Sequence, residues 1–221
     1  MQLALDHLVV ICDPGAPQAQ SLIDLGLTEG SANTHTGQGT ANRRFFFRNA
    51  YVELLWVDDL ALSRREPAFR TRLWERWMRR REGACPLGIA LRPADPRDAE
   101  EHPAFATWAY HAPYLAPQVS IGIAVNSPLT EPEILYVNFA TSPASKNREP
   151  LDHQLGVKEI TGLRIGVPGD LPQAAAAKAV AASGLAEFFR AADYVAEVLL
   201  DGAVHQRSAD LRPGLPLIFR Y

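Results

Sequence analysis

Short apolar runs, several of them rich in β-branched side chains, recur along the chain and predict an architecture dominated by β-strands. Near the start, Leu3–Cys12 is interpreted as a strand, and Ala16–Gly26 places apolar residues at helical spacing before a closing glycine. After a polar stretch, Asn42–Phe47 and Tyr51–Val57 are further strand candidates. With the weaker run at 27–33 counted as a strand, the order is βαβββ.

The end of the chain predicts a similar order of elements. Ile160–Val167 is expected to be a strand and Leu171–Ser183 an alanine-rich helix, followed by a second short helix at 186–191. Three strand candidates complete this segment: Tyr194–Leu200, Val204–Leu211 and Leu215–Tyr221. The two ends therefore resemble an internal duplication of a βαβββ module, in pattern rather than in residue identity.

Between these modules the sequence predicts an inserted αβ segment. Ala61–Glu82 is expected to be helical, with an apolar stripe formed by Phe69, Leu73, Trp74 and Trp77. Four strand candidates follow, which would extend the sheet or cover its open face: Leu87–Leu91, Thr107–Tyr110, Val119–Val125 and Ile134–Phe139. The expected organisation is one compact α+β domain with a first module at 1–58, an insertion at 59–157 and a second module at 158–221.

Composition narrows the class of partner. Of the 221 residues, 47% are hydrophobic and 21% charged, and the formal net charge of −3 provides no electrostatic reason to bind nucleic acid. The start does not resemble a signal peptide, and no run of about eighteen apolar residues occurs, so we expect a cytoplasmic protein without a membrane partner. Cys12 and Cys85 provide no disulfide framework and are expected to be buried thiols. The expected partner is a small-molecule ligand.

Two of the apolar strands each carry a side chain that requires a partner, His7 in the first and Glu53 in the last strand of the first module. An imidazole or carboxylate in such a strand must be paired, protonated or bound to an ion, because its desolvation is costly. Metal ligation is one explanation for both residues. A salt bridge from Glu53 to Arg43 or Arg44 is a structural alternative. A hydrogen bond between His7 and Glu53 is another, and it would raise the pKa of the histidine.

The polar stretch before the strand at 42–47 supplies candidate substrate-binding groups. Its Thr-Gly-Gln-Gly-Thr segment at 36–40 has two glycines and several donors, which suit an anionic or carbonyl ligand or, alternatively, a flexible connection. Asn42 and Arg43 face opposite sides of the strand, so only one of them can point into a cavity, and an inward arginine would suit a carboxylate. His35, beside this stretch, and His111, in an aromatic segment, are further candidates.

These residues resemble the vicinal oxygen chelate superfamily and, within it, the glyoxalase-like domain proteins of bacteria. The resemblance rests on Leu5-Asp6-His7-Leu8-Val9, on the segment from His35 to Arg43, on Tyr51-Val52-Glu53-Leu54 and on the paired βαβββ order. It implies two modules that form a cupped mixed sheet around a cavity, often with a divalent metal ion that polarises substrate oxygens. By position, His7 and Glu53 correspond to the metal ligands of the first module. Glu53 is also a candidate catalytic base if burial raises its pKa. Imidazole and carboxylate ligands do not select the identity of the ion.

The predicted second module departs from the family pattern. Its ligand positions fall near Gly162 and Ile218, which have no ligating side chain, so a metal site would need substitutes such as His111, His153 or Glu159. Three functions stay open. One is a metal-assisted lyase, isomerase or dioxygenase acting on a small oxygenated compound, and another is a metal-free protein that binds or sequesters a small molecule. The third is a protein whose cup is filled by side chains and which acts through an interface. The resemblance also leaves a homodimer as a possible state.

Overall fold

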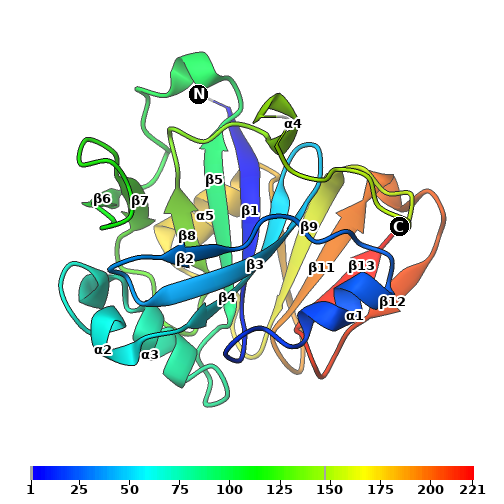
Figure 1. The fold of residues 1–221 in the computed structure, drawn as a ribbon, viewed down its shortest axis with the longest axis horizontal. Helices are drawn as coiled ribbons and strands as arrows, with labels where there is room; N and C mark the ends of the chain where they lie inside the picture. The colour runs from blue at the N-terminus through cyan, green and yellow to red at the C-terminus, as the bar shows by residue number, and fades with distance from the viewer. Residues whose placement is uncertain (1, 147) are drawn as a thin grey trace.

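The fold is built around a curved sheet of eight strands. The computed structural model describes residues 2–146 and 148–221, and its larger sheet has the order β2-β3-β4-β1-β5-β8-β7-β6 (Figure 1). The strands of this sheet are β1 Leu3–Ile11, β2 Asn33–His35, β3 Thr40–Phe46, β4 Tyr51–Val57, β5 Leu87–Pro93, β6 Thr107–Tyr110, β7 Ile121–Ala124 and β8 Glu133–Tyr136. The short helix α1, Ala19–Asp24, lies between β1 and β2 in the chain.

The curved sheet consists of two halves with the same strand order. β1 pairs in parallel with β4, and β5 pairs in parallel with β8, while β1 and β5 meet antiparallel at the centre. Each half is therefore a βαβββ module, with the 3-10 helix η2, Pro96–Asp98, in the place of α1 in the second half. The paired modules and the cupped mixed sheet predicted from the sequence are confirmed.

The segment that forms the second half of the cup differs from the expectation. It spans 87–136, which lies within the predicted insertion, whereas 158–221 does not join this sheet. The reason is that the module pattern is weak in the second half. Its helix is a single 3-10 turn without an amphipathic repeat, and β6, β7 and β8 have 4 residues each.

The end of the chain forms a separate sheet of five strands in the order β10-β9-β11-β13-β12. Its elements are β9 Ile160–Val167, α5 Ala175–Ala182, β10 Glu187–Arg190, β11 Val195–Leu200, η3 Asp201–Ala203, β12 Ser208–Asp210 and β13 Leu217–Arg220. In this sheet β10 pairs in parallel with β9, β9 pairs antiparallel with β11, and β11 pairs in parallel with β13. The centre of the larger sheet has the same sequence of pairings, which explains why this segment resembles a module. The predicted helix at 186–191 is wrong, because pairing with β9 makes this segment β10.

The region predicted as one helix over Ala61–Glu82 contains three short helices. These are α2 Leu60–Ser63, η1 Ala68–Thr71 and α3 Leu73–Met78. Pro67 lacks the amide hydrogen that a continuing helix needs, and Arg72 has a left-handed backbone with φ of 58°. As a result, the predicted apolar stripe is interrupted. Phe69 is 44% exposed, whereas Trp77 packs against the core.

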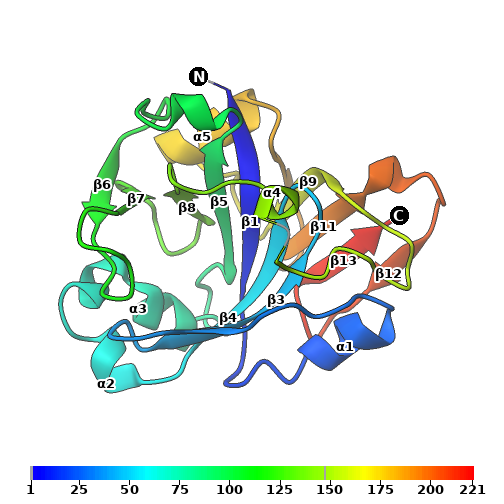
Figure 2. The same cartoon turned by 45° about the horizontal axis from the view of Figure 1, so that its top comes forward.

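The two faces of the central strands are buried against different surroundings. Leu8 and Val10 of β1 belong to a continuous apolar cluster that includes residues of β9, β11 and β13, so this cluster joins the two sheets. Figure 2 shows the second sheet, coloured yellow to red, beside the curved one. Val9 and Ile11 face the inside of the cup. Because β1 is buried on both faces, its sequence is a nearly continuous apolar run, and its alternation places His7 on the inner face.

Both cysteines are free and buried, as the sequence predicts. Burial raises the pKa of the Cys12 thiol and of the Cys85 thiol to about 12, so neither is a reactive thiolate at neutral pH. Across the described residues, no helix has the length and apolar character needed to cross a membrane.

The turn before β3 requires a glycine at position 39, so replacement of Gly39 should lower the free energy of unfolding. Gly39 has φ of +76°, and a Cβ built there would lie 2.3 Å from the backbone oxygen of Asp59. Gly184 has a similar φ of +75° but nothing within 4 Å. We expect Gly184→Ala to cost about 1 kcal/mol for the left-handed backbone alone and Gly39→Ala to cost about 2–4 kcal/mol because of the added overlap. Urea denaturation of the two variants measures the difference, and equal losses would contradict the overlap.

Candidate functional site

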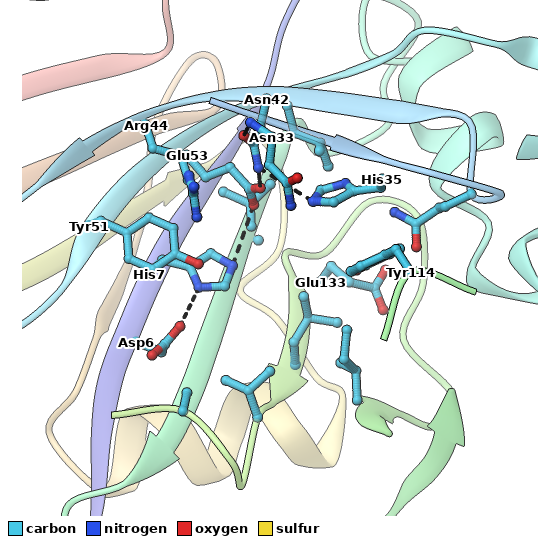
Figure 3. Close-up of a pocket in the computed structure, with 18 of the residues that line it drawn as sticks. Asp6, His7, Asn33, His35, Asn42, Arg44, Tyr51, Glu53, Tyr114 and Glu133 are labelled. Carbon is cyan, nitrogen blue, oxygen red and sulfur yellow. Dashed lines mark hydrogen bonds and ion pairs between the residues drawn. The ribbon is translucent and has the colours of Figure 1, made fainter. Parts of the chain in front are cut away.

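The inside of the cup contains a cavity of about 410 Å³ that is lined by both halves of the larger sheet. Strands β1, β3 and β4 contribute polar side chains such as His7, Asn42 and Glu53, whereas β7 and β8 contribute Ile123 and Leu135 together with Glu133. A cavity of this size, apolar with a few convergent polar groups, is typical of small-molecule sites. Figure 3 shows the polar wall, where His7 and Glu53 point toward each other.

A β-bulge places two consecutive polar side chains of β1 in this cavity. In the pairing with β5, Leu5 lies opposite Leu91 and His7 lies opposite Ala90, so Asp6 is an extra residue between two paired positions. Consecutive strand residues otherwise point to opposite faces. The bulge turns Asp6 toward the same side as His7, and its Oδ2 lies 2.7 Å from Nδ1 of the imidazole.

The His7 ring lies between two carboxylates. Nδ1 contacts Asp6, and Nε2 lies 3.4 Å from Oε2 of Glu53 (Figure 3). Burial alone would lower the pKa of His7, but its contacts with Asp6 and Glu53 outweigh burial and raise the pKa to about 9. His7 is therefore an imidazolium at neutral pH. Tyr51 stacks on the same ring, with centroids 4.4 Å apart, and restricts its rotation.

Glu53 is an ionised carboxylate with only 6% of its surface exposed. Its Oε1 accepts a hydrogen bond from Nδ2 of Asn42 at 2.5 Å, and Oδ1 of Asn42 accepts one from the backbone N–H of Asn33 at 2.8 Å. Burial raises the pKa of Glu53, but the interactions with His7 and Asn42 reverse this effect and lower the pKa to about 2. Asp6, His7, Glu53 and Asn42 thus form a continuous polar row across β1, β4 and β3.

A second polar group connects the two halves of the cup. Nδ1 of His35 lies 2.8 Å from Oγ1 of Thr40, and the His35 ring stacks on Tyr114 with centroids 4.5 Å apart. Gln38 donates a hydrogen bond to Thr40 and accepts one from the hydroxyl of Tyr110, each at 2.7 Å. Burial lowers the pKa of His35, so this imidazole is neutral where His7 is charged.

The pKa shifts of His7 and Glu53 predict how stability depends on pH. The His7 pKa is raised from 6.5 to about 9, so its contribution is complete below pH 6.5 and is lost as pH rises through about 9. The Glu53 pKa is lowered from 4.5 to about 2, so its contribution is complete above pH 4.5 and is lost as pH falls through about 2. We expect the destabilisation caused by His7→Asn to shrink by roughly 1–3 kcal/mol between pH 6 and pH 10. Denaturation series at both pH values measure it, and a loss that grows with pH would contradict the imidazolium.

The side chains present do not complete a divalent-metal site. His7 and Glu53 are suitable ligand types, but the described chain has no group of three or more His, Cys, Asp or Glu side chains that could hold a metal ion. Strand register explains the deficit. In the first half, Glu53 of β4 pairs with Val9 of β1, which is two residues after His7. In the second half, Leu135 of β8 pairs with Ala90 of β5, which is two residues after Gly88. Gly88 and Leu135 therefore occupy the equivalent places in the second half, and neither has a ligating side chain.

The structure brings together some of the predicted site residues and separates others. Four of them line the cavity: His7, His35, Asn42 and Glu53. Arg43 points away from the cavity, where Nε and Nη2 each lie 2.6 Å from a carboxylate oxygen of Glu29. The alternation of β3 thus selects Asn42 as the inward member of the pair, so Arg43, the other substrate-binding candidate, does not reach the cavity.

The substitute ligands considered from the sequence lie elsewhere. His111 and Glu159 are exposed, and neither lines the cavity. His153 is buried outside the cavity, where its ring nitrogens bond to backbone groups at 3.0 Å and 2.9 Å. The ligand positions expected near Gly162 and Ile218 belong to the second sheet, because the second half of the cup comes from another segment.

Sequence reasoning gave no role to several residues that complete the site. Asp6 adjoins His7 in the chain, and strict alternation would place it on the opposite face, so only the bulge against β5 reveals its role. Gln38, Tyr110 and Tyr114 come from a loop and from the unrecognised second half. The sequence did contain one signal for them, the aromatic segment around His111. Its residues Tyr110 and Tyr114 line the cavity, whereas His111 does not.

Comparison with known proteins places these observations in a family. A family model described as a glyoxalase-like domain matches residues 5–182, which include both halves of the cup. This match agrees with the relationship predicted from the sequence motifs. A search of curated proteins found no match.

Similar solved structures include a hypothetical protein from Staphylococcus aureus, with a TM-score of 0.50 and 13% identity over 99% of both chains. A methylmalonyl-CoA epimerase in complex with methylmalonyl-CoA and ammonium has a TM-score of 0.39 and 15% identity, over 65% of this chain and 100% of that one. A variant of the Streptomyces coelicolor methylmalonyl-CoA epimerase, in complex with 2-nitronate-propionyl-CoA, has a TM-score of 0.38 and 14% identity, over 62% and 97%. At these identities the likeness concerns the fold alone.

Proposed function

Since the chain belongs to the family of glyoxalase-like domain proteins, we propose that it is a lyase or isomerase that moves a proton next to a carbonyl group of a small oxygenated compound. The observation that carries this proposal is the row formed by Asp6, His7 and Glu53 in a largely apolar cavity. The row holds a carboxylate and an imidazolium side by side, which are the two groups that such a proton transfer requires.

Each member of the row has a distinct task in this scheme. Glu53 is the base, because its carboxylate lines the cavity and is ionised at neutral pH. His7 supplies an N–H from Nε2 to the oxygen on which negative charge develops when the C–H proton leaves. Asp6 holds Nδ1 and so orients the imidazolium. The contact of 3.4 Å between His7 and Glu53 is long, so a substrate oxygen can replace Glu53 as the acceptor.

The proton balance of the reaction closes within the site. Glu53 takes the proton from carbon, and the electron pair of that C–H bond forms an enediolate or enolate. Return of the proton to the former carbonyl carbon, with transfer of the enediol hydroxyl proton to the neighbouring oxygen, completes an isomerisation. Expulsion of a leaving group from the carbon on the other side of the deprotonated carbon completes an elimination, and Glu53 then releases its proton to solvent. Asn42 keeps Glu53 oriented in both protonation states, because its Nδ2 donates to the carboxylate.

A second candidate function is binding without chemistry. It is favoured by the apolar second half of the cup, where Gly88 and Leu135 hold the positions equivalent to His7 and Glu53. In this case the polar row would fix the orientation of a carbonyl or hydroxyl ligand, and the protein would sequester that compound.

Proton exchange with solvent tests the first function against the second. The protein is incubated in D₂O with a panel of 2-hydroxy and 2-oxo acids, aldehydes and hydroxyketones, and loss of each proton next to a carbonyl is followed by NMR. We expect protein-dependent exchange for at least one compound after treatment with a chelator. Binding without exchange, measured calorimetrically on the same panel, would favour sequestration. Exchange that appears only after addition of manganese, nickel, iron or zinc would support the metal-assisted scheme instead.

A further inference from the structure

At its solvent-exposed side, which we call the entrance, the cavity is lined by residues of the segment 139–146 and by residues 148 and 149, a stretch that contains the short helix α4, Pro143–Lys146. Two contacts tie this segment to the first half of the cup. The backbone N–H of Ala144 donates to the carbonyl of Arg48 at 3.1 Å. The carboxylate of Glu149 accepts hydrogen bonds from the backbone N–H and the hydroxyl of Ser31, at 2.9 Å and 2.5 Å. The segment therefore has a defined place beside the entrance.

Positive side chains gather at this entrance. Lys146 and Arg148 line the cavity and are exposed, and neither has a carboxylate partner among the residues that the structure describes. Arg44 also lines the cavity, and its guanidinium donates at 2.8 Å and 2.7 Å to Ser31, the residue that also bonds Glu149. The carboxylate of Glu149 lines the cavity beside these residues, and its hydrogen bonds to the neutral Ser31 leave its charge in place, so three cations face one carboxylate here.

The interior of the cavity does not neutralise this charge. His7 lies between the carboxylates of Asp6 and Glu53, and the Arg92 guanidinium lies 3.8 Å from Asp6, so both of these interior carboxylates already have a basic side chain beside them. The remaining carboxylate of the wall, Glu133, is paired with the buried Arg76. The entrance therefore carries a local positive excess in a protein whose formal net charge is −3.

An apolar surface adjoins the positive rim. Phe139 lines the cavity and is 45% exposed, and Leu115 and Ile121 continue the apolar lining inward. A ligand that extends from the interior to the rim would thus meet apolar side chains along its body and cations at its outer end.

We infer that the ligand of this cavity is an organic anion, with a body that fills the apolar cup and a carboxylate or equivalent anionic group held at the rim by Lys146, Arg148 and Arg44. This inference rests on the proposed ligand-binding function of the cavity and adds the chemical class of the ligand. Charge attraction at such a rim also raises the rate of entry and falls with salt.

A matched pair of dyes tests the inference. The probes are 1-anilinonaphthalene-8-sulfonate and N-phenyl-1-naphthylamine, which share the same aromatic body and differ in the sulfonate. We expect the anionic dye to bind more tightly at low salt, and the advantage to fall by roughly fivefold or more in Lys146→Ala/Arg148→Ala. The neutral dye should bind equally well to both proteins. Lys178→Ala, an exposed lysine on α5 outside the cavity, is the control and should change neither affinity.

The outcomes separate this inference from the proposed function. Equal affinity for the two dyes, or an anionic preference that survives the double substitution, would overturn the anionic class while leaving a ligand-binding cavity in place. Failure of both dyes to bind would count against the ligand-binding cavity itself, and so against the proposed function. Because Lys146 and Arg148 are exposed, their replacement should leave the circular dichroism spectrum unchanged.

Discussion

Glu53→Gln is expected to reduce proton exchange next to a carbonyl by roughly 10²–10⁴-fold, because the amide has the shape of the carboxylate but cannot accept the proton. The Gln oxygen can still accept the hydrogen bond from Asn42, so the local geometry has a replacement partner. His7 loses the negative charge beside Nε2, and its pKa should fall as a second, independent sign of the change. Exchange measured by NMR and histidine ring titration check the two effects on the same sample.

The matched control is Glu197→Gln in the second sheet. Glu197 is also 6% exposed and is held by ion pairs to Arg164 and Arg220 at 2.6 Å and 2.7 Å, but it lies outside the cavity. The Glu197→Gln variant should be less stable than the unaltered protein but should keep its exchange activity. Full activity in Glu53→Gln would remove Glu53 from the role of base, whereas equal activity losses in both variants would indicate a general effect of destabilisation.

Arg76→Met is expected to have the largest effect on stability, a loss of about 3–5 kcal/mol, because it leaves a buried carboxylate unpaired. Arg76 is 1% exposed, and its Nη2 lies 2.9 Å from Oε2 of Glu133. Its Nη1 donates to three backbone carbonyls, those of Cys85, Leu129 and Glu131, at 2.8–3.0 Å. This one side chain therefore joins α3 to the loops that enclose the second half of the cup.

Two further variants identify the cause of that loss. Arg79→Met alters an arginine that follows α3, half exposed and 3.7 Å from Glu75, and should change the free energy of unfolding by about 0–1 kcal/mol. Arg76→Met combined with Glu133→Leu removes the unpaired charge and should recover part of the loss. Chemical denaturation of the three proteins makes the comparison. No recovery in the double variant would assign the effect to the three carbonyls rather than to Glu133.

The register of the strands explains why the two halves of the cup differ in chemistry. The first half places an imidazole and a carboxylate on adjacent parallel strands, and the second half places Gly88 and Leu135 there. At Gly88 a Cβ would lie 3.3 Å from Cβ of Val9, so even a small side chain is tight at this position. Asp6, His7 and Glu53 therefore lie on one wall, and under the proposed function the other wall is available for the apolar body of a ligand.

The sequence by itself determined the local elements whose signals are strong. The strands β4 and β9 begin and end as predicted, at Tyr51–Val57 and Ile160–Val167, because dense β-branched and aromatic runs are bounded by turn residues. The need of His7 and Glu53 for a partner also followed from the sequence, since burial of such groups is costly wherever the strands lie. The motifs around them were sufficient to predict the family.

Only the tertiary structure decided which segments form the cup. Residues 87–136 and 158–221 contain similar strand patterns, and the choice between them depends on which one pairs with the free edge of β1. That pairing is a long-range hydrogen-bond interaction that leaves no periodic signal in either segment. The same pairing creates the bulge that turns Asp6 toward His7, and the alternation of β3 sends Asn42 inward and Arg43 outward. The residue types of the site were thus visible in the sequence, but their arrangement depends on strand register, which is a property of the assembled sheet.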